Sequence, residues 1–370
     1  MASTVMEASN DLVGLHASDP VSVYLAAWSR VRGFETTALD AALYEARSLL
    51  KILGMRRTMF VLPVELAGVI QAACTESIAS GERPRLVKMI RDAGIASDAE
   101  RWLEGVEAET VEALHRLGEA TAAELTKEVE GLRAQIPFGA GKTWQGQVGV
   151  STRLLFLLAA EGRIIRGRPK GTLVSSLYRW APLDRWVPGG LPKPPGDEAR
   201  VELVRRWLAT FGPGSTKDIR WWTGWTVAQV KKALARIGPV EVELDDGSTG
   251  WLLPDDLEPT PAPSSPWVAL LPALDPTTMG WQARDWYLGE HRRQLFDTNG
   301  NAGPTIWLDG RVVGGWIQRR DGEIAYRLLE DVGGEAADLV AARAIGLRTW
   351  LGDLRFIPRF RTPLERELSA

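Results

Sequence analysis

The chain has 370 residues, 45% of them hydrophobic, and a formal net charge of −3. This length is typical of two or three globular domains, and the composition is sufficient for buried cores. The sequence contains no run of about 18 apolar residues and begins without the basic and apolar segments of a signal peptide. We therefore expect a cytoplasmic protein with no membrane partner. The single cysteine, Cys74, excludes an internal disulfide, and the three scattered histidines make a metal site improbable.

The charge is unevenly distributed along the chain. Residues 1–134 carry −6, residues 135–195 carry +7 and residues 196–370 carry −4. Because screening confines each charge to its surroundings, about 8 to 10 Å at physiological salt, a basic segment can bind a polyanion although the total charge is negative. A solvated basic loop would give the same excess.

The first 117 residues predict a domain of helices with one strand. Residues 9–15 and 21–31 favour helices on either side of Asp19-Pro20. A longer helix is predicted over residues 36–52, capped by Thr36 or Thr37, and a strand over residues 56–63. Two further helices are predicted over residues 67–79 and 98–117.

Residues 118–186 predict a second domain with a basic hairpin. Helices are expected over residues 120–134 and 151–163, the latter capped by Ser151, with a Gly-rich loop over residues 138–149 between them. The sequence GAGK in that loop lacks the upstream spacing of a phosphate-binding loop, so no nucleotide site is predicted. Two strands follow, around a turn at residues 167–171. The basic side chains on or beside this hairpin are expected to contact DNA phosphates: Arg163, Arg166, Arg168 and Lys170.

Residues 197–258 give the clearest pattern. Helices are predicted over residues 201–212, 216–222 and 227–237, with Ser215 or Thr216 and Thr226 as caps. Strands over residues 239–244 and 249–254 flank a tight turn and form a hairpin. Three helices and a hairpin make a winged helix-turn-helix, a frequent DNA-docking unit. Its expected phosphate contacts are Lys217, Lys231 and Lys232.

Each of these three domains contains an apolar helix that leads into strands, so we predict three tandem winged helices. Pro- and Gly-rich linkers flank the third, at residues 187–197 and 259–266. The remaining residues 266–370 form a fourth element, with a strand over 267–275, a helix over 281–296, three strands over 304–329 and a helix over 334–352. The predicted fold class is mainly α with β wings, that is, α+β.

The chain contains 16 tryptophans, and Trp221, Trp222 and Trp225 lie close together in the third domain. Aromatic side chains in a DNA-binding protein can stack on bases or wedge between them. Packing in the hydrophobic core explains the same residues.

Several phrases resemble one family, from about Leu12 to about Leu329. In chain order they are GLHASDPVSVYLAAWSRVRGF, MRRTMFVLP, FGPGSTKDIRWWTGW, LLPALDP and PTIWLDGRVVGGW. They resemble the bacterial winged-helix DNA glycosylases that unhook interstrand crosslinks and excise bulky alkylpurines, the AlkZ/YcaQ-like family. The resemblance implies a C-shaped protein of three winged helices and a small β-rich element that cradles duplex DNA, with a catalytic loop after the first helix.

The family's catalytic loop resembles L-Q-x-Q or Q-x-D, and its polar residues hold the attacking water. The matching positions here are His16, Ala17 and Ser18, which depart from that pattern. The resemblance implies that His16 and Ser18 orient the water and that Asp19 complements the positive charge of the sugar. The family's R-G-T-L-H phrase is matched by Arg56, Arg57 and the three residues after them. In the alternative interpretation, His16 is a surface or cap residue and Asp19-Pro20 only starts a helix.

Two classes of function follow. The first is a monofunctional DNA glycosylase acting on bulky or crosslinked alkylpurines, in base excision repair or in self-resistance to a genotoxic metabolite. It would need no metal or redox cofactor, act as a monomer on double-stranded DNA, and associate with the nucleoid when bound. The second is a catalytically silent winged-helix protein that recognises damaged or distorted DNA or acts as a regulator.

Overall fold

The computed structural model describes residues 1–370 apart from 140, 144, 358–360 and 370. The chain divides into two compact units. The first combines Met1–Leu39 with Val201–Ala370, and the second is the continuous segment Asp40–Arg200. Within the described residues, no helix combines the length and the apolar character that a membrane span requires.

The first unit begins with the helices α1 (Val5–Asp11) and α2 (Pro20–Arg30), with the short strand β1 (Leu15–His16) between them. The helix predicted over residues 9–15 is therefore wrong in position. It cannot form there because Val13 and Gly14 have φ angles of 53° and 106°, which an α-helix does not allow. The helix predicted over residues 21–31 is confirmed as α2.

The third predicted winged helix also belongs largely to the first unit, and its elements are confirmed. They are α10 (Gly196–Phe211), α11 (Thr216–Thr223), α12 (Val227–Ile237), β9 (Val240–Glu243) and β10 (Thr249–Leu252). Ser215 and Thr226 form capping boxes at the starts of α11 and α12, which satisfy backbone N–H groups that would otherwise lack acceptors. Gly214 is needed where it stands, because a Cβ there would lie 2.2 Å from the ring of Trp207.

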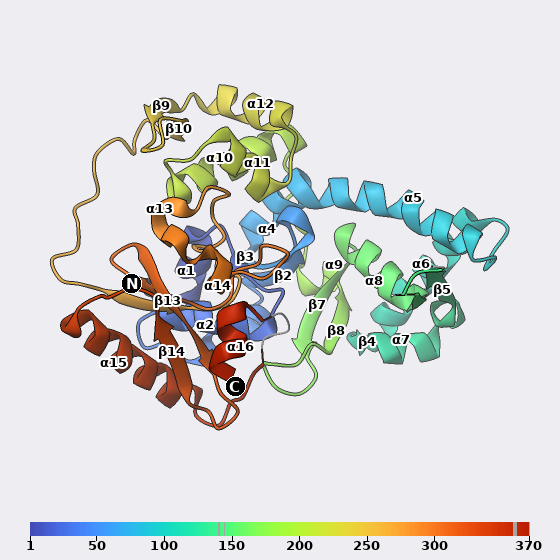
Figure 1. Cartoon of the computed structure of the whole chain (residues 1–370). Helices are drawn as coiled ribbons and strands as arrows, with labels where there is room; N and C mark the ends of the chain where they lie inside the picture. The colour runs from blue at the N-terminus through green and yellow to red at the C-terminus, as the bar shows by residue number, and fades with distance from the viewer. Residues whose placement is uncertain (140, 144, 358–360, 370) are drawn as a thin grey trace. The chain divides into compact units, whose positions relative to one another are not determined.

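The C-terminal part of the first unit is a four-stranded antiparallel sheet in the order β11-β12-β13-β14, with helix α15 along it (Figure 1). The strands are β11 (Val268–Leu271), β12 (Thr305–Leu308), β13 (Arg311–Gln318) and β14 (Ile324–Leu328). The helices are α13 (Asp285–Leu288), α14 (Arg292–Leu295), α15 (Gly334–Leu351) and α16 (Pro363–Ser369), and η5 (Gly289–His291) is a 3-10 turn.

The predicted strands and the last predicted helix are confirmed in this part, with two differences. The helix predicted over residues 281–296 is broken into α13 and α14, because Gly289 adopts a φ of 54° and ends α13. Helix α16 was not anticipated. It begins at a capping box formed by Thr362 and Glu365, and its inner face packs on β13 and α14.

The second unit begins within α3 (Thr36–Asp40) and continues through a π-helical turn, η1 (Ala41–Glu45), into the hairpin β2 (Leu49–Leu53) and β3 (Met59–Pro63). The helix predicted over residues 36–52 is wrong beyond Glu45. Its last part, LLKIL, is fully buried as strand β2, and a short apolar run of this kind fits a buried strand as well as a helix. The strand predicted over residues 56–63 begins only at Met59, because the 3-10 turn η2 (Met55–Arg57) precedes it.

Helices then dominate the second unit. They are α4 (Val64–Ile70), the π-helical turn η3 (Gln71–Thr75), α5 (Glu76–Asp92) and α6 (Ala99–Leu117). The helices predicted over residues 67–79 and 98–117 are confirmed, and the first proves much longer. Cys74 is buried in η3 as a free thiol. No cluster of potential metal ligands occurs among the residues that the structure describes.

The second half of this unit contains two hairpins around α8 (Val150–Ala160). The other elements are β4 (Ala120–Thr121), α7 (Ala122–Glu128), η4 (Glu130–Arg133), β5 (Gln135–Phe138), β6 (Gly146–Gly149), β7 (Ile164–Pro169), β8 (Tyr178–Pro182) and α9 (Leu183–Trp186). The predicted basic hairpin is confirmed as β7 and β8, with α8 and α9 beside it (Figure 1).

Four details of the prediction for this half are corrected. The helix over residues 120–134 is reduced to α7 and a 3-10 turn. The loop over residues 138–149 contains β6, which pairs with β5, although positions 140 and 144, the first within GAGK, lie outside the described residues. Gly149, not Ser151, occupies the N-cap position of α8. The turn of the basic hairpin is wider than residues 167–171, because β7 continues to Pro169 and β8 starts at Tyr178.

Candidate active site and nucleic-acid interface

The loop between β1 and α2 carries the three predicted catalytic residues, all in the first unit. His16 ends β1 and is only 5% exposed, whereas Ser18 is exposed. Asp19 is the N-cap of α2, and its Oδ1 accepts a hydrogen bond of 3.2 Å from the Val21 N–H. Pro20 occupies the first helical turn, where its missing N–H costs nothing. Asp19 thus performs the helix-start role of the alternative interpretation, and its negative charge also suits the helix N-terminus.

Helix α2 is anchored at its other end by the C-terminal element. Arg30 makes two hydrogen bonds, of 2.9 and 2.6 Å, to the carboxylate of Asp275, which is 1% exposed. The Ser29 hydroxyl donates to the Leu270 carbonyl of β11 at 2.7 Å. A bidentate guanidinium–carboxylate pair fixes orientation as well as distance. The predicted catalytic loop therefore leads into a helix that is held firmly at its far end.

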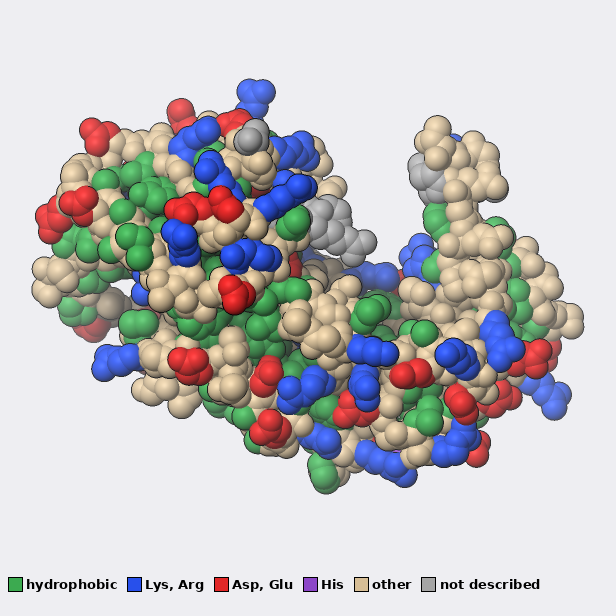
Figure 2. All heavy atoms as spheres, turned by 90° about the horizontal axis from the view of Figure 1, so that it is seen from below, with side chains coloured by type: hydrophobic (Ala, Val, Ile, Leu, Met, Phe, Trp, Pro, Cys, Tyr) green, Lys and Arg blue, Asp and Glu red, His purple; other side chains and the backbone are tan. Residues whose placement is uncertain are grey.

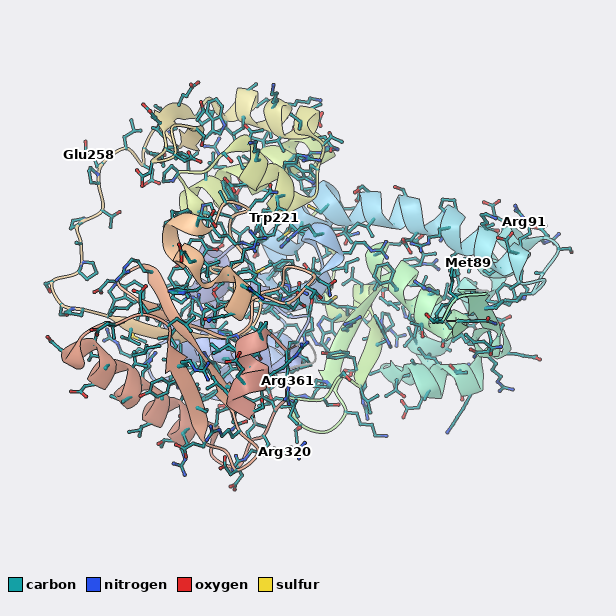
Figure 3. The ribbon with its side chains drawn as sticks, in the orientation of Figure 1. Met89, Arg91, Trp221, Glu258, Arg320 and Arg361 are labelled. Atoms are coloured by element: carbon teal, nitrogen blue, oxygen red, sulfur yellow. The ribbon has the colours of Figure 1, made fainter. Side chains whose placement is uncertain are left out.

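A second carboxyl group lies within electrostatic reach of the loop. Glu365 of α16 is 2% exposed, and its Oε2 accepts the Thr362 N–H at 2.8 Å. Burial raises the pKa of the Glu365 carboxyl, and the negative charge of Asp19 acts in the same direction. Arg361, labelled in Figure 3, opposes this effect. The structure therefore places a buried carboxyl group with a raised pKa within electrostatic reach of the predicted set.

The predicted basic residues at the turn between β2 and β3 are partly engaged. Arg56 and Arg57 have positive φ angles of 52° and 63°. The Arg57 guanidinium pairs with Glu82, lies over the ring of Phe156 at 5.1 Å, and lowers the pKa of Glu82 chiefly through its hydrogen bond. The side chain of Arg57 is nonetheless 44% exposed, so it can still meet an anion.

Arg163 lies within an ion-pair network. Its guanidinium is 2.9 Å from Glu107, a side chain that is 4% exposed, and Arg83 contacts the same carboxylate at 2.9 Å. Arg83 also contacts Glu161 at 2.7 Å. Buried carboxylates require such partners, because an unpaired charge in the interior is costly. Arg163 therefore has a structural role that the sequence pattern did not reveal.

The remaining basic residues of the β7–β8 hairpin lie in three different settings. Arg166 stacks on aromatic rings of β8. Arg168 pairs with Asp40 at 3.3 Å and lies over the ring of Tyr44 at 4.7 Å. Lys170 is exposed in the connection to β8. The charge of the hairpin is thus partly neutralised, because Arg168 is paired with a carboxylate, whereas Lys170 is exposed.

The three predicted lysines of the first unit are exposed. Lys217 lies in the first turn of α11, and Lys231 and Lys232 lie side by side in sequence on α12. On the face drawn in Figure 2, Lys and Arg side chains are interspersed with Asp and Glu. On that face the basic side chains do not form one continuous patch, in keeping with the overall charge of −3.

The chain resembles known proteins both in sequence and in fold. The chain matches the family described as DNA glycosylase AlkZ-like over residues 10–367. It belongs to the AlkZ-like DNA glycosylase family. A solved structure, Streptomyces sahachiroi DNA glycosylase AlkZ, is similar with a TM-score of 0.68 and 20% sequence identity, covering 94% of this chain and 91% of that one. At that identity the likeness concerns the fold. No curated protein sequence matches the chain.

As a member of the AlkZ-like family, the protein is a hydrolase that acts on DNA. Its mixed α and β architecture agrees with the predicted α+β class and with the AlkZ fold. Both the predicted catalytic loop and the basic hairpin fall within the residues that match the family. The predicted catalytic loop and the three lysines lie in the first unit, whereas the arginines and Lys170 lie in the second.

The tryptophan cluster of this AlkZ-like protein serves mainly as core. Trp222 and Trp225 are 3% and 8% exposed. Trp221, labelled in Figure 3, is partly buried and packs against the Arg284 guanidinium at 4.6 Å. Trp222 and Trp225 are therefore core residues, as the packing interpretation predicts.

Two buried charged residues of this AlkZ-like chain were not predicted from the sequence. They are Glu365 and Lys51, which are 2% and 6% exposed. The signal for Glu365 was available, since Thr362 and Glu365 have the spacing of a capping box ahead of a helix. Lys51 gave no usable signal, because it lies within the apolar run that was assigned to a helix.

Proposed function

We propose that the protein is a monofunctional DNA glycosylase that hydrolyses the N-glycosidic bond of bulky or crosslinked alkylpurines in duplex DNA. Its substrates would be N7-alkylguanine and N3-alkyladenine adducts, met in base excision repair or in self-resistance to a genotoxic metabolite. The observation that carries this proposal is the family match over residues 10–367, which includes the loop His16–Asp19 at the start of a firmly anchored helix.

The chemistry demands little beyond positioning. An alkylated purine is already cationic, so it leaves with the electrons of its bond to C1′ without being protonated. Water then bonds to C1′ and loses a proton. We assign this water to His16, which accepts its proton, and to Ser18, which orients it, while the carboxylate of Asp19 complements the oxocarbenium-like sugar. No metal or redox cofactor enters these steps.

We propose that the chain carries three winged helices and a C-terminal element, over residues 1–117, 118–186, 197–258 and 266–370. The order of elements supports this. Helices α1 to α3 precede the hairpin β2–β3, helices α7 and α8 precede β7–β8, and α10 to α12 precede β9–β10. A single chain with three such modules can embrace duplex DNA as a monomer, whereas a single helix-turn-helix usually dimerises on two half-sites.

The phosphate contacts that we propose are distributed over both units. Because contacts to phosphates position the duplex without reading its sequence, we expect weak binding with little sequence preference. The residues are Arg56, Arg57, Arg163, Arg166, Arg168, Lys170, Lys217, Lys231 and Lys232.

A catalytically silent DNA-binding protein is the second candidate function. Two observations favour it: His16 is 5% exposed, and Asp19 is engaged as a helix cap. Both would make the loop a structural element of a protein that recognises distorted DNA.

The two candidates differ in the excision of a base. In a single-turnover assay for abasic sites on duplexes carrying N7-alkylguanine, we expect the wild type to excise and His16→Ala to be slower by about 10²- to 10⁴-fold, the usual contribution of a general base. His291→Ala is the matched control, because that histidine lies in the same unit but pairs with Glu330. Equal rates for wild type and His16→Ala would remove His16 from the mechanism. Binding without excision of any lesion would establish the silent candidate.

A further inference from the structure

Two cations of the second unit share one aromatic ring. The Arg166 guanidinium lies 5.0 Å from the ring centre of Tyr178 and 5.3 Å from that of Trp180. The Lys51 ammonium lies 4.7 Å from the ring centre of Tyr178. The three strands that carry these residues, β2, β7 and β8, adjoin within the unit.

The strand register explains how Arg166 reaches both rings. Arg166 pairs directly with Trp180, but the register then shifts, so that Pro169 pairs with Tyr178. Tyr178 and Trp180 are two residues apart and therefore point to the same face of β8. The irregularity in β7 keeps Arg166 beside both aromatic side chains. Lys51 is the central residue of β2 and is only 6% exposed.

Unlike Arg163 and Arg168, Arg166 has no carboxylate within salt-bridge distance among the described residues. Arg163 is paired with Glu107, and Arg168 is paired with Asp40. Burial lowers the pKa of the Arg166 guanidinium, and the neighbouring Tyr178 opposes this effect. A poorly hydrated cation without an anion is costly, and stacking on aromatic rings recovers only part of the cost. Such an arrangement suits a residue whose anion is supplied by a ligand.

The space beside these cations is a partly enclosed pocket with a mostly apolar lining. Its volume, including the part open to solvent, is about 330 Å³, and its lining includes Lys51, Phe156, Arg166 and Trp180. An apolar lining displaces water and so strengthens the attraction between a bound anion and the two cations. A guanidinium offers paired N–H donors to two oxygens of one phosphate, and an ammonium adds a point charge.

We propose that Lys51 and Arg166, seated on Tyr178 and Trp180, form a phosphate clamp that binds one phosphodiester of the DNA backbone. The inference rests on the proposed function, because DNA then supplies the anion. It goes further in one respect: one defined phosphate is gripped by a buried pair, instead of many phosphates being attracted by a diffuse basic surface.

A scan of neutral phosphates tests the clamp. Duplexes carry one abasic-site analogue to fix the binding register and one uncharged methylphosphonate at each successive position. For the wild type we expect one position at which neutralisation weakens binding about tenfold. Lys51→Met and Arg166→Met should weaken binding to the unmodified duplex by a similar factor and lose their sensitivity at that position alone.

Arg179→Met is the matched control. Arg179 lies on β8 between Tyr178 and Trp180, is exposed, and points to the opposite face of the strand. This variant should remain sensitive at the clamped position. If circular dichroism shows that Arg166→Met is unfolded, Arg166→Gln takes its place, because glutamine keeps a polar end on the side chain.

The outcomes separate the clamp from the proposed function. A wild type that binds and excises, but shows no position of special sensitivity, would overturn the clamp and leave the glycosylase intact. Arg166 variants with the wild-type profile, or a control that loses the same position, would also overturn it. An Arg166-dependent rise in melting temperature with inorganic phosphate, without a sensitive duplex position, would assign the site to free phosphate instead. Absence of duplex binding would overturn the proposed function itself.

Discussion

The carboxyl group of Asp19, at the start of α2, interacts electrostatically with that of Glu365 in α16. The two groups differ in burial and in their hydrogen bonds. Asp19 accepts a backbone N–H in a partly exposed position, which suits a carboxylate. Glu365 is buried, and both its burial and the charge of Asp19 raise its pKa. At the scale of single residues, the two carboxyl groups therefore differ in the direction in which their surroundings move the proton equilibrium.

Glu365→Gln should change how stability depends on pH. Because the pKa of Glu365 is raised in the folded state, the stability linked to its proton is complete below the unfolded pKa of about 4.3 and is lost as pH rises through the folded value. Glutamine keeps an acceptor for the Thr362 N–H and does not titrate. The melting temperature of the variant relative to wild type should therefore increase as pH is raised from about 4 to 8.

Glu367→Gln serves as the control for that measurement, because the Glu367 side chain is 55% exposed and pairs with Arg327 at the surface. Its difference from wild type should stay small across the range, as exposed ion pairs contribute little. A Glu365→Gln difference that is constant with pH would contradict a raised pKa.

The residues of the candidate site could be predicted only where a local sequence pattern indicated them. The family motifs indicated His16, Ser18 and Asp19, and the pair Asp19-Pro20 also indicated the start of a helix. The setting of Arg166 could not be predicted, because it depends on a register shift between β7 and β8. The pairing of Arg163 with Glu107 joins residues 56 positions apart, and no local pattern encodes such a pairing.

At the scale of elements, the sequence specified best those helices whose ends carry their own signals. Ser215 and Thr226 mark the starts of α11 and α12, and Gly224 and Gly238 end them in left-handed conformations. LLKIL had no such signal, and its burial in β2 comes from pairing with β3. The prediction failed where tertiary pairing, not local preference, decides between helix and strand.

Arg30→Met should loosen the helix that follows the catalytic loop. It leaves the buried carboxylate of Asp275 without its guanidinium partner, and breaking a buried pair in this way costs about 3 kcal/mol. We expect this loss of stability in urea unfolding, together with a slower excision rate. Arg30→Met combined with Asp275→Leu should recover most of the stability, because the unpaired charge is then gone. A single variant as stable as wild type would show that the pair does not anchor α2.

At the scale of the whole molecule, basic residues proposed for DNA binding occur in both units, although the net charge is negative. Replacing Lys217, Lys231 and Lys232 together by Gln should reduce the slope of log affinity against log salt by about 0.9 for each phosphate that the variant no longer neutralises. Lys88→Gln is the control, because Lys88 is exposed and pairs with Asp92 on α5. A slope that the triple variant leaves unchanged would place the DNA surface of the first unit elsewhere.

The first unit is made from both ends of the sequence, and this has a consequence for biosynthesis. On the ribosome, Met1–Leu39 emerges first, but its partners in Val201–Ala370 appear only after the whole second unit has been translated. At about 5 to 20 residues per second, the 75 residues from Val201 to Asp275 take roughly 4 to 15 seconds. During that interval the second unit can fold as a continuous segment, whereas α2 still lacks Asp275 and β11. A nascent or prematurely terminated chain therefore carries the basic hairpin of the second unit before the His16 loop has its anchor, so under the proposed function DNA affinity would arise earlier in synthesis than base excision.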